Sequence, residues 1–187
     1  MTISEIIKNR RAIPPRFLTG TEISREVIEN LLENASWAPN HKKTEPWRFQ
    51  VYTGKSKLEL AEDCESILRE KQAGGYEVAT EKIDKFLANL KNVPVAIAII
   101  LQVDPAHRLP EWEEVAAVSM AVQNMWLTVT EMGLGAFWAT PEFKELFSGI
   151  LGLQSGQKVL GFFYVGEIMM DYPSPGRSDQ SQKVEWK

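Results

Sequence analysis

The chain has 187 residues with 21 basic and 25 acidic side chains, which gives a formal net charge of −4 at pH 7. This acidic balance disfavours nucleic acid as a partner, and the longest strongly apolar run, residues 93–101, is far shorter than the ~20 residues that cross a bilayer. The single cysteine, Cys64, excludes an internal disulfide. The length predicts one domain, residues 1–187. Because the first ten residues contain no apolar signal segment, the protein is expected to be cytoplasmic.

Apolar residues at helical spacing predict four helices in the first part of the chain. They span residues 2–11, 24–37 and, on either side of the Gly74-Gly75 break, two surface helices within 56–91. Pro14 and Pro15 keep the connection after the first helix extended. A polar loop over 38–47 then leads into a strand over 47–54, in which apolar and polar residues alternate.

The rest of the chain predicts three extended segments and two helices. The apolar run 95–100 is typical of a central strand, because it shows no polar alternation. Helix 111–132 is apolar on nearly all sides, which predicts a buried central helix. The remaining elements are a short strand or extended turn over 133–138, a short helix over 141–151 and a strand over 158–166.

Strands separated by long helices could belong to a parallel sheet with a dinucleotide site. The turn from Gly133 to Trp138 has only two glycines and precedes an extended segment, so it lacks the dinucleotide-binding pattern. The expected fold class is therefore α+β. Hydrolase and metal chemistry are disfavoured, because there is no Gly-x-Ser-x-Gly turn and neither His41 nor His107 has a ligand spacing with Cys64.

Two polar segments are candidates for binding. Arg10 and Arg11 end the first predicted helix, where they either stabilise the negative helix end or bind an anion. Asn40 and His41 lie in the loop between two prolines, which is either a solvated turn or part of a site. Residues 1–48 hold eight Lys and Arg against six Glu, and a locally basic region on an acidic protein suits a small anion.

The order of these segments resembles the small, single-domain branch of the FMN-dependent NAD(P)H nitroreductases. Four stretches carry the resemblance: IIKNRRAI, ASWAPNHKKTEPWRFQVYTG, LPEWEEVAAVSMAVQNMWLTVTEMGLGAFWAT and KVLGFFYVG. The resemblance implies a mixed, mostly antiparallel sheet wrapped by helices around a central buried helix. It also implies an obligate homodimer with one FMN in each of two sites between the subunits.

Matched motif by motif, the resemblance implies a set of FMN-contacting residues. Arg10, Arg11 and Ala12 match an Arg-Arg-Ser segment beside the phosphate and the flavin edge, so Ala12 lacks the family's hydroxyl. The other matched positions are Trp37, Asn40 and His41 around the loop, Trp138, Ala139 and Thr140 in the turn after the central helix, and Arg177 in the C-terminal tail. No metal and no catalytic side chain is implied, because the flavin carries the hydride chemistry.

Two positions depart from the family pattern. Lys43 and Glu45 stand where many members carry Asn and Gln. A carboxylate beside a reduced flavin would be unfavourable, so Glu45 is expected to face away or to pair with Lys42, Lys43 or Arg48.

The tryptophans divide between packing and binding. Trp47 and Trp126 lie among apolar neighbours and are expected in the core. Trp138 follows two glycines where the chain leaves the central helix, and glycine permits close approach to a ligand, so Trp138 is expected to lie against the flavin.

The resemblance implies an enzyme in which NAD(P)H reduces FMN and leaves, after which a nitroaromatic or quinone takes the electrons, in ping-pong fashion. One alternative is another flavin reaction of the same family, such as dehalogenation or flavin fragmentation. A second is a flavin-binding redox sensor without enzymatic activity. The sequence leaves open the choice between NADH and NADPH, the physiological acceptor, and whether Arg177 contacts the phosphate.

Overall fold

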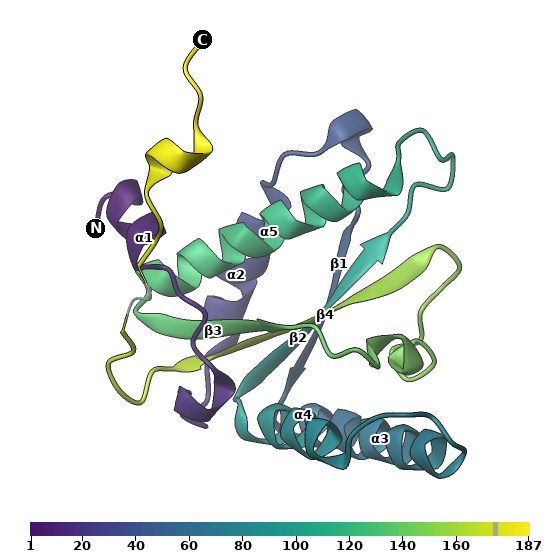
Figure 1. The fold of residues 1–187 in the computed structure, drawn as a ribbon. Coiled ribbons are helices and arrows are strands. Elements are labelled where there is room, and N and C mark those ends of the chain that lie inside the picture. Colours follow the sequence, from purple (N-terminus) through teal and green to yellow (C-terminus); the bar gives the residue numbers. More distant parts are fainter. Residues whose placement is uncertain (174–175) are drawn as a thin grey trace.

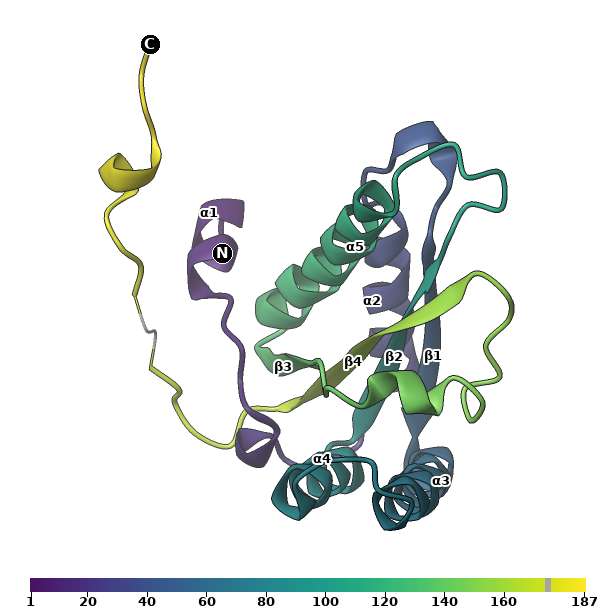
Figure 2. The same cartoon turned by 45° about the vertical axis from the view of Figure 1, so that its right-hand side comes forward.

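The computed structural model describes residues 1–173 and 176–187 as helices around a four-stranded sheet (Figures 1 and 2). The helices are α1 (Ile3–Asn9), α2 (Arg25–Ser36), α3 (Gly54–Ala73), α4 (Thr80–Asn92) and α5 (Glu111–Glu131). The strands are β1 (Trp47–Thr53), β2 (Val95–Gln102), β3 (Leu134–Ala139) and β4 (Gln157–Glu167). Short 3-10 turns are η1 (Pro15–Phe17), η2 (His41–Lys43), η3 (Lys144–Phe147) and η4 (Gln180–Lys183).

The sheet has the order β1-β2-β4-β3, and every neighbouring pair of strands is antiparallel. The extended connection after α1 adds one isolated parallel bridge, between Ala12 and Ala136 of β3. A second isolated bridge joins Leu18 to Ile168 after β4. The predicted α+β class and the mostly antiparallel sheet are therefore confirmed. Among the described residues, the isolated bridge at Ala12 is the only parallel pairing.

Each face of the sheet buries its own hydrophobic core. Side chains alternate across a strand, so Ile97 and Ile99 of β2 pack beneath α2 and α5, while Ala96 and Ala98 face α3 and α4. Figure 2 shows these two helix pairs on opposite sides of the sheet. Burial on both faces explains why the predicted central strand carries no polar alternation.

Helix α5 is less enclosed than its sequence predicted. Val118, Val122 and Met125 are fully buried against the sheet. Trp112 is 68% exposed and Met120 is 39% exposed, so one side of the helix is uncovered in the single chain. None of the helices within the described residues is long and apolar enough to cross a membrane.

The predicted helix over 141–151 is wrong, because this segment forms turns and only the 3-10 element η3. Its apolar residues are still buried, since Phe147 packs against Phe86 and Phe162 with ring centroids 5.3 and 6.1 Å apart. Gly149 and Gly152 lie close after η3, and Gly152 has a φ of +60°. Glycine disfavours a helix interior, so the segment ends after one turn.

Gly161 of β4 allows the end of β3 to approach β4 closely. Its φ is +143°, and it lies opposite Ile99 where the register between β2 and β4 shifts at a bulge. A Cβ at this position would approach the carbonyl oxygen of Ala139 to 2.3 Å. The end of β3 therefore depends on a glycine in β4.

Gly161→Ala is expected to destabilise the fold by about 1–3 kcal/mol, because it adds both backbone strain and a steric clash. Gly149→Ala is the matched control, since a Cβ there meets no atom within 4 Å and its φ is not positive. Urea unfolding of both variants measures the effect. Equal midpoints for the two variants would contradict the close approach at Gly161.

Candidate functional site

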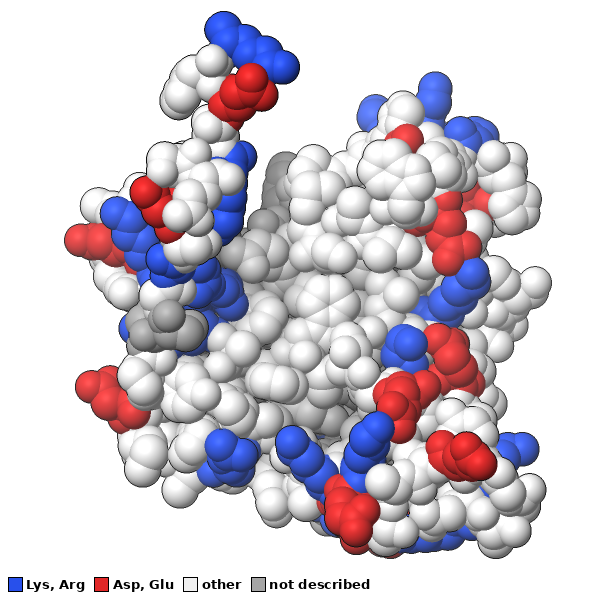
Figure 3. Space-filling model, viewed as in Figure 1, with Lys and Arg blue, Asp and Glu red and all other residues white. Residues whose placement is uncertain are grey.

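Three arginines from opposite ends of the chain line one cavity of about 760 Å³. Arg10 and Arg11 follow α1, and Arg177 lies in the segment after β4, on the side of the molecule that carries α1 (Figure 1). The full lining is Ile7, Lys8, Arg10, Arg11, Ala12, Tyr172, Pro173, Gly176 and Arg177. Figure 3 shows Lys and Arg gathered on this side, beside a broad hollowed face that is largely uncharged. We call this cavity the arginine pocket.

Contacts from α5 and from the C-terminal segment hold the arginines in place. The guanidinium carbon of Arg10 lies 4.8 Å from the centre of the Trp126 ring, a cation–π contact. The indole Nε1 of Trp126 donates to the carbonyl oxygen of Arg11 at 2.9 Å. Arg11 in turn donates from Nε to the carbonyl oxygen of Tyr172 at 3.1 Å.

These contacts correct the prediction that Trp126 is an ordinary core residue. Trp126 is only partly buried, and its ring packs edge-on against Phe163 at 5.4 Å while its polar edge faces the arginine loop. Helical periodicity places it on the side of α5 that faces this loop. Trp47, in contrast, is 8% exposed and lies in the core, as predicted.

The arginine pocket is electropositive. Partial burial, together with the charge of Arg177, lowers the pKa of Arg10. Among the described residues, no Asp or Glu forms an ion pair with Arg10, Arg11 or Arg177. Like charges held together without a carboxylate favour a bound anion, and guanidinium groups suit phosphate geometry.

A second cavity, of about 700 Å³, opens on the other side of the β3 end. It joins Ala139 and Thr140 to Pro14, Pro15 and Arg16 of the N-terminal connection and to one side of α4. The full lining is Pro14, Pro15, Arg16, Lys82, Lys85, Phe86, Asn89, Phe137, Ala139, Thr140, Pro141, Glu142, Phe143 and Tyr164. We call it the aromatic cavity. It combines an apolar interior with cations, of which Lys82 is paired with Glu142 at 2.9 Å.

Of the predicted turn at the end of β3, only Ala139 and Thr140 line this cavity. The side chain of Trp138 points to the other face of the sheet, where it packs with the core beneath α5. Its Nε1 is buried and has no hydrogen-bond partner among the described residues. Strand alternation turns Trp138 and its neighbour Ala139 to opposite faces of the sheet, and β3 ends before Thr140.

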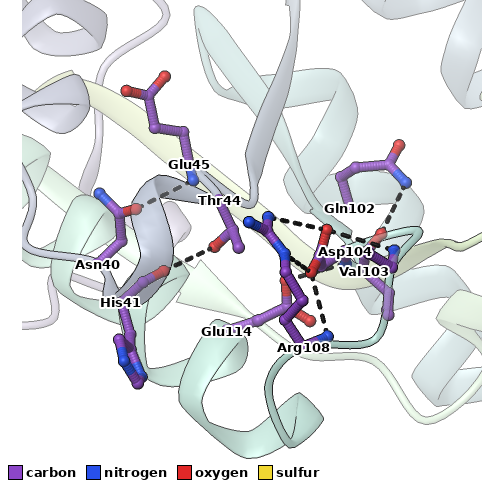
Figure 4. A network of polar contacts seen from close by, with 10 residues as sticks. Asn40, His41, Thr44, Glu45, Gln102, Val103, Asp104, Arg108 and Glu114 are labelled. Carbon is purple, nitrogen blue, oxygen red and sulfur yellow. Dashed lines mark hydrogen bonds and ion pairs between the residues drawn. The ribbon is translucent and has the colours of Figure 1, made fainter.

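The loop before β1 is held in an unusual backbone conformation (Figure 4). Lys42, Lys43 and Glu45 have φ values of 58°, 54° and 43°, which non-glycine residues rarely adopt. Asn40 Oδ1 accepts from the backbone N–H of Glu45 at 3.1 Å and fixes the turn. Backbone strain of this kind gathers at functional sites. Among the described residues Glu45 has no ion-pair partner, and Arg48 donates to its backbone carbonyl instead.

His41 links this loop to α5, and a second set of contacts holds the loop that precedes α5. His41 Nδ1 lies 2.7 Å from Glu113 Oε2. Buried Glu114 accepts from the backbone N–H of Asp104 at 2.9 Å, and Figure 4 shows the carboxylate of Asp104 facing Arg108. The Arg108 guanidinium lowers the pKa of Asp104 to about 2.

The predicted loop residues do not share a cavity with the arginines in the single chain. Trp37 is 78% exposed. Asn40 and His41 line a shallow hollow with Trp112 and Met120, on the uncovered side of α5. Eight of the ten predicted residues line one of three cavities: the arginine pocket, the aromatic cavity or this shallow hollow. Trp37 lines a separate hollow with Ile3 and Ile6, and Trp138 packs against the core. Among the described residues, no group of three His, Cys, Asp or Glu could hold a metal ion.

Sequence reasoning missed Trp126 and the α4 side chains of the aromatic cavity. Trp126 carried a signal in principle, because a partly buried tryptophan tends to place its N–H against a hydrogen-bond acceptor. Lys85 and Asn89 carried none, since they lie on an ordinary amphipathic helix and meet Ala139 only through the tertiary fold.

Comparison with known proteins gives a consistent result. The model of the Nitroreductase family matches residues 7–167. YfhC of Bacillus subtilis, whose name describes it as an NAD(P)H nitroreductase, is 30% identical to this chain. The match covers 88% of this chain and 83% of YfhC. Iodotyrosine deiodinase 1 of Rattus norvegicus is also 30% identical, over 92% of this chain and 61% of its own.

Solved structures share the fold. A nitroreductase-like protein from Bacillus cereus aligns with a TM-score of 0.84 and 26% identity, over 100% of this chain and 96% of its own. A nitroreductase from Desulfovibrio desulfuricans, solved in complex with FMN, aligns with a TM-score of 0.76 and 20% identity, over 100% and 97% of the two chains.

Proposed function

Because the chain belongs to the nitroreductase family, we propose that it is an FMN-dependent oxidoreductase that uses NAD(P)H to reduce an electron-poor acceptor, a nitroaromatic or a quinone. The single observation that carries this proposal is the arginine pocket beside the aromatic cavity. Arg10, Arg11 and Arg177 offer a site for a phosphate dianion, and the neighbouring cavity offers apolar walls to a flat ring.

The residues present fit FMN on chemical grounds. The cations of the arginine pocket have no carboxylate partner among the described residues, so a phosphate would satisfy them. The N-terminal connection lines both cavities, with Ala12 in the first and Pro14 in the second, and could follow the ribityl chain between them. Lys85, Asn89 and Thr140 supply donors at the aromatic cavity for the polar edge of the ring.

Bound FMN would supply the chemistry, accepting hydride from NAD(P)H and passing electrons to the acceptor. The chain's own residues bind and orient. Arg10 and Arg11 fix the phosphate end, and Trp126 fixes those arginines. No side chain of the site is needed as a nucleophile or metal ligand.

A second copy of the chain completes the proposed site. Asn40 and His41, which the family resemblance assigns to flavin contact, line the exposed hollow with Trp112 and Met120. Trp37, assigned to the same role, is exposed and lines a separate hollow between α1 and α5. Exposed aromatic and Met side chains of this kind are typical of an interface. In a homodimer these two exposed hollows would bring the three residues to the partner's flavin.

The expected result in sedimentation is a dimer at micromolar concentration. Trp112→Glu is expected to shift the mass towards the monomer and to weaken FMN binding, because it places a charge on the uncovered side of α5. Glu111→Gln provides a neighbouring control outside that surface. A flavin-loaded monomer would contradict the shared site.

The reaction is tested by mixing the flavin-loaded protein anaerobically with NADH or NADPH and then adding a nitroaromatic or a quinone. The flavin absorbance is expected to bleach with the nicotinamide and to return with the acceptor. Flavin that neither cofactor reduces would exclude the proposed enzyme and favour a flavin-binding redox sensor. The faster of the two nicotinamides identifies the physiological donor.

One observation favours a second activity. The 30% identity to rat iodotyrosine deiodinase 1, over 92% of this chain, makes reductive dehalogenation the alternative reaction. Release of iodide from a halogenated phenol by the reduced protein, without turnover of nitroaromatics or quinones, would support it. Flavin fragmentation would instead consume the flavin, so recovery of the original absorbance excludes it.

A further inference from the structure

The side chains of His41 and Glu113 meet although the two residues lie far apart in the sequence. His41 begins η2, Glu113 lies in the first turn of α5, and His41 Nδ1 is 2.7 Å from Glu113 Oε2. Both residues line one hollow of about 380 Å³ with Trp112 and Met120. The proposed dimer would turn this hollow towards the partner's flavin.

Three acidic residues begin α5, and each has a different partner. Glu111 pairs with Lys158 at 2.7 Å, and buried Glu114 accepts a backbone N–H of the loop before α5. Glu113 is the one that contacts His41. The helix dipole favours negative charge in this turn, which accounts for all three carboxylates. It does not account for the direct contact between Glu113 and His41.

This contact orients a ring and contributes little to stability. The His41 side chain is 56% exposed and the Glu113 side chain is 25% exposed, and an exposed ion pair stabilises a fold only weakly. Other bonds hold the backbone of the loop. The N–H of Thr44 donates to the carbonyl oxygen of His41 at 3.4 Å, and Asn40 Oδ1 accepts from the N–H of Glu45 at 3.1 Å. What Glu113 fixes is the imidazole ring.

The contact also determines which ring nitrogen of His41 carries the proton. A carboxylate only accepts hydrogen bonds, so Nδ1 is the donor to Glu113. In the neutral ring Nε2 is then an acceptor. Among the described residues Nε2 has no hydrogen-bond partner. It can therefore accept from an N–H group of a ligand, such as the one between the two carbonyls of an isoalloxazine ring.

We propose that Glu113 is a positioning residue for flavin binding. It holds His41 in the tautomer with Nδ1 protonated and leaves Nε2 to accept a hydrogen bond from the flavin of the partner subunit. His41 makes this contact, and Glu113 acts only through His41. The inference rests on the proposed function, which supplies both the flavin and the second subunit.

Imidazole 15N NMR of the apoprotein tests the tautomer. It is recorded at about pH 8, where a histidine of ordinary pKa is neutral, and His107 is the only other histidine of the chain. His41 is expected to carry its proton on Nδ1 in the wild type and in Glu113→Gln, which keeps an acceptor. In Glu113→Ala the proton is expected to shift towards Nε2. The same tautomer in wild type and Glu113→Ala would overturn the inference.

Titration with FMN tests the consequence for binding. Glu113→Ala is expected to weaken FMN binding by about three- to tenfold, the value of one neutral hydrogen bond, and His41→Ala by at least as much. In the His41→Ala background, Glu113→Ala is expected to have no further effect. Glu111→Ala is the matched control in the same helical turn, and it is expected to leave FMN affinity unchanged.

A further loss of affinity when Glu113→Ala is added to His41→Ala would overturn the inference, because Glu113 would then act by another route. Equal FMN affinity of wild type and Glu113→Ala would also overturn it, while the proposed function would stand. If the wild-type protein itself fails to bind FMN, the inference and the proposed function fall together.

Discussion

Arg10→Ala is expected to weaken FMN binding by about ten- to a hundredfold, the value of roughly 1.5–3 kcal/mol for a hydrogen bond to a charged group. Arg10 lines the arginine pocket, is partly buried, and has a lowered pKa because of burial and of Arg177. A bound phosphate would relieve the repulsion between the two arginines. Fluorescence titration of the apoprotein with FMN measures the change.

Arg25→Ala is the matched control for the loss of one positive charge. Arg25 is 91% exposed at its side chain and pairs with Glu29 within α2, away from the arginine pocket. Its removal is expected to leave FMN affinity unchanged. If the two variants weaken FMN binding to the same extent, only the overall charge matters and the pocket is not the phosphate site.

Trp126→Ala is expected to destabilise the apoprotein by about 2–4 kcal/mol and also to weaken FMN binding. The first effect follows from the lost contact with Phe163 and the cavity left behind. The second follows because Trp126 supports Arg10 with its ring and the Arg11 backbone with its Nε1. Urea unfolding and FMN titration separate the two effects.

Trp126→Phe keeps an aromatic ring but removes the indole N–H. It is expected to lose less stability than Trp126→Ala. It is also expected to retain the part of the FMN affinity that depends on the contact between Arg10 and the aromatic ring. Trp186→Ala is the control, since Trp186 is 93% exposed and should leave stability unchanged. Full FMN affinity in Trp126→Ala would contradict the positioning of the arginines by this residue.

The strands and helices were predictable where one local signal dominated. Residues 95–100 carry an uninterrupted apolar run, and β2 is buried on both faces as that run predicts. The alternation of Trp47, Phe49 and Val51 predicted β1, which ends at Thr53. Gly74 and Gly75 separate α3 from α4 as predicted.

Local signals failed where tertiary contacts decide the outcome. The apolar residues at 141–151 suggested a helix, but Phe147 satisfies its burial from a single 3-10 turn against other aromatic rings. The apolar surface of α5 suggested complete enclosure, yet Trp112 stays exposed in one chain. Sequence periodicity counts apolar residues without saying which neighbour covers them.

The candidate site was predictable in its chemistry and less so in its geometry. Arg10 and Arg11 stood out by type and position, and the structure brings them beside Arg177 across the length of the chain. Family resemblance, and no spacing within the sequence, pointed to Arg177. Trp126 packs against the core as predicted but also contacts the arginine loop, and Trp138 packs against the same core while Ala139 lines the aromatic cavity. Strand and helix periodicity turn single side chains to faces that only the fold defines.

Under the proposed function, the arginine pocket recognises the phosphate of flavin mononucleotide. Titration of the apoprotein with FMN and, in parallel, with riboflavin tests it most directly, because the two ligands share the ring and differ in the phosphate. FMN is expected to bind at least about a hundredfold more tightly, since the phosphate meets charged hydrogen-bond donors. Equal affinity for FMN and riboflavin, or no binding of FMN, would contradict the assignment of the pocket.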